Sequence, residues 1–127
     1  MKTLSTFSMI CLIFSLSLIV APHAEPADWV LVSDGKTTKT YVDKESMVKS
    51  KSDDLRKIWM KMEFNDDTKY DYFLDLYEYE CSERRYRVIQ GKTYLKNGEI
   101  IDAVLDPAWR YSTPKTTAET VIGFVCR

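Results

Sequence analysis

The feature that most limits how this chain can fold is a pair of cysteines, Cys81 and Cys126, placed far apart in the sequence. A third cysteine, Cys11, lies inside the N-terminal apolar run Leu4–Val20. That run follows Lys2 and precedes small and turn-forming residues, which is the pattern of an export signal. Cleavage would remove Cys11 and leave an even number of cysteines in an oxidising compartment. We therefore expect one disulfide, Cys81–Cys126.

The proposed domain boundaries follow from this signal. Residues 1–24 are predicted to be a cleaved signal peptide, and residues 25–127 a single domain, since removing 24 of the 127 residues leaves 103. An uncleaved membrane anchor is the alternative, because the apolar run is marginally long enough to span a bilayer. Cys11 lies within the run rather than after it, so we do not expect it to carry a lipid. After cleavage no segment of membrane-spanning length remains.

Composition argues against several classes of function. Of the 18 Lys and Arg residues only Lys2 leaves with the signal, so 17 oppose 19 Asp and Glu and the mature net charge is −2. Nucleic-acid-binding domains usually show a strong basic excess, so no nucleic-acid partner is expected. The one histidine, His23, falls in the segment to be removed, so the usual general base of nucleophilic catalysis is missing. We therefore expect that the protein is not an enzyme and has no cofactor and no metal site. For the two cysteines, a pair of free buried thiols remains the alternative to the disulfide.

Strand patterns dominate the mature chain. Apolar and polar residues alternate with a period of two, and clusters of turn residues separate the runs. Asn97-Gly98 is the clearest hairpin turn, and Asp43 is placed to cap a brief helical turn over Lys44–Met47. The predicted strands are Trp29–Val32, Thr37–Val42, Leu55–Phe64, Tyr70–Cys81, Arg85–Leu95 and Ile100–Leu105.

The C-terminal segment changes to a helical period. Thr116 and Glu119 form a capping box, and an apolar stripe follows at helical spacing. The stripe consists of Ala118, Val121, Ile122 and Val125. Cys126 lies at its edge, so the disulfide to Cys81 would fix the apolar face of the helix on the sheet. The predicted fold is α+β: an antiparallel sheet of about six strands, with one C-terminal helix packed on a face and tethered by the disulfide.

Charge follows the predicted strands. The segment Met62–Glu83 is acidic, and basic residues precede and follow it. If consecutive strands pair, the acidic strand lies between two basic ones and cross-strand ion pairs are expected. The alternative is an exposed basic edge that binds polyanions or acidic protein surfaces. Its members would be Lys44, Lys49, Lys51, Arg56 and Lys57.

Other candidate sites are less specific. Glu78 and Glu80 share a face and would suit acid/base work, but carboxylates at this spacing are common on surfaces. Asp66, Asp67 and Asp71 superficially suggest a calcium site, but their loop lacks the glycine and the distal glutamate of an EF-hand. The many tyrosines, with Trp59 and Trp109, are expected to form an aromatic core. Some of them would alternatively line a groove for a ligand or peptide.

The order of landmarks along the chain resembles the surface-adhesin protein E family of Gram-negative bacteria. These landmarks are Trp29, Tyr41-Val42-Asp43 with Ser46, Trp59, the run from Tyr77 to Arg87, Tyr94, Gly98, Trp109 and Val125-Cys126. The resemblance implies an antiparallel sheet with a disulfide-tethered C-terminal helix. It also implies a non-enzymatic protein that binds host extracellular-matrix or plasma proteins at the cell surface.

One departure from the family opens a second hypothesis. The resemblance implies a lipoprotein at the outer membrane, whereas Cys11 lies in no usable lipidation motif. The alternative is a soluble periplasmic protein that binds a peptide or small ligand through an aromatic sheet face. In either case we expect a monomer or a weak dimer.

Overall fold

The computed structural model describes residues 27–103, 105 and 107–127. The predicted signal peptide, its cleavage site and Cys11 lie outside the described residues. Within the described ranges, no helix has the length and apolar character that crossing a membrane requires.

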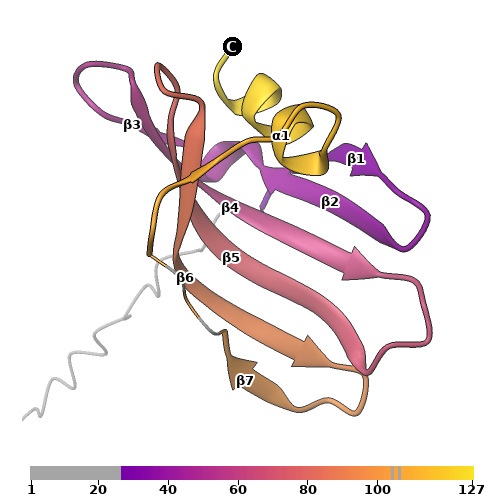
Figure 1. The fold of residues 1–127 in the computed structure, drawn as a ribbon. Coiled ribbons are helices and arrows are strands. Elements are labelled where there is room, and N and C mark those ends of the chain that lie inside the picture. Colours follow the sequence, from indigo (N-terminus) through magenta and orange to yellow (C-terminus); the bar gives the residue numbers. More distant parts are fainter. Residues whose placement is uncertain (1–26, 104, 106) are drawn as a thin grey trace, which may run out of the picture.

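The strands form one antiparallel sheet, with the order β1-β2-β4-β5-β6-β7 (Figure 1). Two short strands lie off this path, since β3 pairs with β4 and β8 pairs with β6. The bounds are β1 Trp29–Asp34, β2 Thr38–Asp43, β3 Val48–Lys49, β4 Leu55–Phe64, β5 Tyr70–Glu80, β6 Arg85–Leu95, β7 Ile100–Asp102 and β8 Arg110–Tyr111.

The predicted α+β class is confirmed, and the six strands of the main path correspond to the six predicted strands. β4 and β6 have the predicted bounds, and Asp43 caps the short 3-10 helix η1 (Lys44–Ser46) by accepting a hydrogen bond from the backbone N–H of Glu45. Gly98 has a φ of 89°, which glycine adopts without strain, and its N–H donates to Leu95 O at 3.0 Å to close the hairpin. β7 ends at Asp102 and is therefore shorter than the predicted strand Ile100–Leu105.

The two faces of the sheet differ in cover. In an antiparallel pair, directly opposed residues project from the same face. Ile58 opposes Tyr77, and Arg56 opposes Tyr79, so these side chains share a face with Met60. We call it the helix face, because α1 (Thr117–Val125) packs on it, and call the other the reverse face.

The N-cap of the helix is Thr116, whose Oγ1 accepts a hydrogen bond from the N–H of Glu119 at 3.3 Å. This confirms one half of the predicted capping box. The Glu119 carboxylate instead accepts hydrogen bonds from Ser112 Oγ at 2.6 Å and from the Arg84 guanidinium. The start of the helix is thereby fixed to the turn between β5 and β6.

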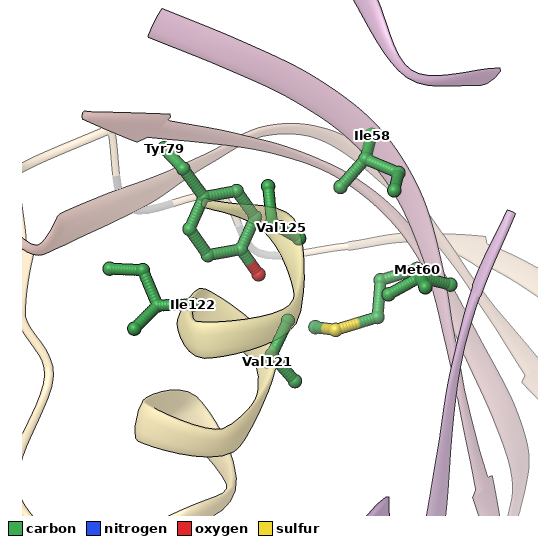
Figure 2. Packing of buried hydrophobic residues seen from close by; sticks show 7 residues of the cluster. Ile58, Met60, Tyr79, Val121, Ile122 and Val125 are labelled. Atoms are coloured by element: carbon green, nitrogen blue, oxygen red, sulfur yellow. The ribbon is translucent and has the colours of Figure 1, made fainter. Parts of the chain in front are cut away.

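The core lies between α1 and one end of the helix face. Val121, Ile122 and Val125 pack against a buried set contributed by β2, β4 and β5. Figure 2 shows the Tyr79 ring beside Ile122 and Val125, and the Met60 side chain directed at Val121. Burying each such side chain contributes about 1.5–3 kcal/mol. The sheet residues of the core are Val42, Ile58, Met60 and Tyr79.

The expected disulfide is present. Cys81 follows the last residue of β5, Cys126 is the C-cap of α1, and their Cα atoms are 5.6 Å apart. The bond joins the end of the helix to the end of a central strand, as the sequence predicted.

The expected cross-strand ion pairs are also present. Glu78 lies between its neighbours on the reverse face, 3.7 Å from Lys57 Nζ and 2.8 Å from Arg87 Nε. Arg85 Nη2 lies 2.7 Å from Glu80 Oε2. The acidic β5 is therefore held between basic residues of β4 and β6. These contacts favour the observed register.

Candidate functional site

The five residues of the predicted basic edge lie around β3 and the start of β4. Lys44 is in η1, Lys49 ends β3, Lys51 is in the following turn, and Arg56 and Lys57 begin β4. The four lysines are exposed. Lys49 lies 3.7 Å from Asp53, and Lys57 lies 3.7 Å from Glu78, so both have acidic neighbours.

The prediction that Arg56 is exposed is wrong, since only 6% of it is accessible. Its Nη1 donates to the carbonyls of Val125 at 2.5 Å and Arg127 at 3.0 Å, and its Nη2 lies 3.2 Å from Asp53 Oδ2. The last carbonyls of a helix have no partner within it, and a cation at that end also complements the helix dipole. Arg56 therefore holds the end of α1.

The remaining lysines do not form one flat patch. Lys49 opposes Arg56 across the β3–β4 pair, so it projects from the helix face. Lys57 opposes Val48 and projects from the reverse face. The exposed part of the basic edge therefore wraps around the β3–β4 hairpin.

Replacing Arg56 should weaken folding far more than replacing its neighbour. Arg56→Met leaves the buried carbonyl of Val125 without its donor, and we expect the free energy of unfolding to fall by about 2–4 kcal/mol. Lys57→Met is the matched control, because Lys57 is exposed and its partner Glu78 keeps the ion pair with Arg87, so the loss should be less than about 1 kcal/mol. Urea denaturation measures both, and similar losses would contradict the role given to Arg56.

The helix covers only part of its face (Figure 1). Beyond the core the same face continues with three aromatic rings, which we call the open cluster: Phe64, Tyr70 and Phe73. Their ring centroids are 4.8–6.0 Å apart, the range of favourable aromatic contacts. None of the three belongs to the buried core. The aromatic residues thus divide between the core, as for Tyr79, and an accessible surface.

Among the described residues, the helix face has cavities at the following places. The first, about 230 Å³, lies where the start of α1 meets the sheet, and its lining includes Met62, Tyr86 and Ala118. The second, about 260 Å³, lies at the open cluster. The second cavity is lined by Tyr70, Phe73, Asp75, Thr93, Ile101, Asp102 and Ala103.

Asp75 is the residue of the second cavity that the sequence analysis missed. It opposes Met60 on one side and Gly91 on the other, in the middle of the sheet. Its Oδ1 is buried and has no hydrogen-bond partner among the described residues. Burial raises the pKa of this carboxyl group to about 6, because the charged form loses its water.

Gly91 makes room for this carboxylate. A Cβ atom at position 91 would lie 1.9 Å from Asp75 Oδ1, a distance that no side chain tolerates without displacement. A glycine inside a strand often marks such a close approach. The available signal was the alternation itself, since Asp75 interrupts the aromatic positions Phe73, Tyr77 and Tyr79 that project from the same face.

Removing the charge of Asp75 should stabilise the protein in a pH-dependent way. The folded-state pKa of about 6 lies above the usual 3.8, so the folded state binds more protons between these values and stability falls as pH rises through them. Because the group is only partly buried, we discount the full effect for solvent screening. We therefore compare the gain in unfolding free energy of Asp75→Asn over wild type at two pH values. We expect this gain to be larger at about pH 8 than at about pH 4, by about 1 kcal/mol.

Urea denaturation of both proteins at the two pH values provides the measurement. Asp71→Asn, an exposed change on the same strand, serves as the control and should show no such dependence. A difference between Asp75→Asn and wild type that is the same at both pH values would contradict the shifted pKa.

The reverse face carries a separate aromatic group. Lys61 Nζ lies 5.2 Å from the ring centroid of Trp29 and 5.0 Å from that of Tyr41, and 2.9 Å from Glu63. Its charge is thus already balanced by a carboxylate and two aromatic faces. By contrast, the carboxylate of Asp75 has no ion pair among the described residues, and its buried Oδ1 accepts no hydrogen bond there.

Comparison with known proteins identifies the family. The family model for surface-adhesin protein E matches residues 29–127. Neither the curated proteins nor the solved structures include a match to the chain. Since the family model covers the whole sheet and the helix, this chain belongs to the surface-adhesin protein E family.

Proposed function

We propose that this family member is an exported, non-enzymatic adhesin that binds host extracellular-matrix or plasma proteins at the surface of a Gram-negative bacterium. The observation that carries the proposal is the family match over residues 29–127. The disulfide supports export, because such bonds persist mainly in oxidising compartments. The protein acts as a monomer or weak dimer, without a cofactor or metal and without a nucleic-acid partner.

The environment of the candidate acid/base pair supports a role without catalysis. Glu78 is bound by Lys57 and Arg87, and Glu80 by Arg85. Both carboxylates are thus engaged in cross-strand ion pairs with basic residues of the neighbouring strands. These residues stabilise the pairing of β5 with its neighbours.

Two surfaces are candidates for binding. The lysines at positions 44, 49, 51 and 57 offer positive charge around the β3–β4 hairpin, which suits acidic protein surfaces and polyanions. The second candidate function, binding of a peptide or small ligand in the periplasm, uses the open cluster. The specific observation in its favour is the cavity of about 260 Å³ that Asp75 and the aromatic rings line.

Localisation and binding assays test the proposal together. Protease treatment of intact cells should digest the protein from outside, and the purified exported form should bind immobilised matrix proteins, plasma proteins or heparin. Protection in intact cells with release by osmotic shock would contradict surface display and favour the periplasmic alternative.

A lysine variant tests the basic edge. Replacing Lys44, Lys49, Lys51 and Lys57 together by glutamine should weaken matrix-protein or heparin binding at least tenfold, because it removes the local positive charge. The matched control replaces four other lysines, Lys36, Lys39, Lys96 and Lys115. Equal binding by wild type and the first variant would exclude the basic edge as the binding surface.

A further inference from the structure

The middle of the sheet holds a charge that the fold does not need. Asp75 has no ion pair among the described residues, and its Oδ1 has no hydrogen-bond donor there. Burying a charged or polar group without a partner costs free energy. An aromatic or aliphatic residue at this position would continue the pattern of Phe73 and Tyr77 and avoid that cost. A binding partner that supplies the missing charge would account for the carboxylate.

The surroundings of Asp75 define the chemistry of that partner. The rings of Phe73 and Tyr70 have centroids 5.3 Å apart, and both residues line the same cavity as Asp75. Aromatic faces attract cations, and their bodies pack well on aliphatic chains. Asp102, the other acidic lining residue, is bound to Lys92. A carboxylate beside aromatic rings is therefore suited to an organic cation and repels an anion.

The volume of the cavity sets the size of the ligand. Sites for drug-sized ligands range over about 300–1,000 Å³. The cavity at Asp75, at about 260 Å³, is smaller than that range. Its size suits one long side chain better than a complete small molecule. The cavity lies on an accessible sheet face, so such a side chain can enter while the rest of its polypeptide stays outside.

We propose that the cavity binds an arginine or lysine side chain of a partner polypeptide. The cationic group lies against the Asp75 carboxylate, and the aliphatic stem packs on Phe73 and Tyr70. Gly91 is required because a larger residue would displace the carboxylate from the floor of the site. This inference specifies a ligand for the open cluster and rests on the proposal that the protein is a binding protein. It is independent of the basic edge.

The experiment uses blocked single amino acids as probes and the purified exported protein. N-acetyl-arginine N-methylamide and N-acetyl-lysine N-methylamide supply the two cations, and N-acetyl-norleucine N-methylamide is the neutral control of similar shape. Titration is followed by NMR of backbone amides. We expect saturable shifts centred on Asp75, Gly91 and Thr93, with dissociation constants on the order of millimolar for at least one cation. The neutral probe should bind at least tenfold more weakly.

Two variants assign the effect to the carboxylate. Asp75→Asn keeps the shape of the side chain, and should weaken binding of the cationic probe at least tenfold. Asp71→Asn removes a nearby exposed charge from the same strand, and should leave binding unchanged. The amide spectrum of each variant verifies that it is folded.

Three results would overturn the proposal: no saturable shift with either cation, equal binding of the neutral probe, or unchanged binding by Asp75→Asn. Failure of the proposed function is a different result, because it would appear as absence of matrix-protein binding by the whole protein. Binding of the cationic probes at Asp75 without matrix-protein binding would support the inference and favour a peptide as the ligand.

Discussion

The end of α1 is fixed to the sheet at two points within one helical turn, and the rest of the structure depends on this attachment. One point is the disulfide between Cys81 and Cys126. The other is the buried guanidinium of Arg56, which binds the carbonyls of Val125 and Arg127. The disulfide lowers the conformational entropy of the unfolded chain, and the hydrogen bonds satisfy carbonyls that have no partner within the helix. Together they determine which part of the sheet the helix covers.

A helix held there is too small to cover the whole face. Nine residues of α-helix are about 13 Å long, and a helix is about 10 Å wide. The ten residues of β4 extend for about 33 Å. The helix therefore forms a core at one end of the face, around Ile58 and Tyr79, and leaves the open cluster accessible. The cavity with Asp75 lies in that uncovered part. The buried Oδ1 of Asp75, which has no hydrogen-bond partner among the described residues, lowers stability, and such costs are common where a protein retains a residue for binding.

Much of the fold could be predicted from the sequence, because it follows local patterns. Period-two alternation located β4 and β6, and the apolar stripe located α1. The alternation of acidic and basic strands predicted cross-strand ion pairs, and Glu78 and Glu80 make such pairs. The two-residue strands β3 and β8 were missed, because two residues carry no measurable period. The part of the sheet that α1 covers could not be predicted from the sequence either, since it depends on tertiary contacts.

The errors at the candidate site have a shared cause. Arg56 was grouped with lysines of the same charged segment, although its alternation with Ile58 and Met60 places it on the helix face. Asp75 was counted as one acidic residue of a charged strand, although the same rule places it among aromatic side chains. The net charge is a property of a whole segment, whereas the environment of each side chain depends on the sheet face from which it projects. The four lysines of the basic edge remain a hypothesis for binding.

The central claim is that α1 protects only one end of the helix face, and hydroxyl-radical footprinting tests it most directly. In the oxidised protein Tyr79, which is 2% accessible, should resist modification, while Tyr70 and Phe73 react. Reduction of the disulfide should raise the reactivity of Tyr79 and change that of the open cluster little. Equal protection of Tyr70 and Tyr79 in the oxidised protein would contradict the account, because it would mean that the whole face is covered.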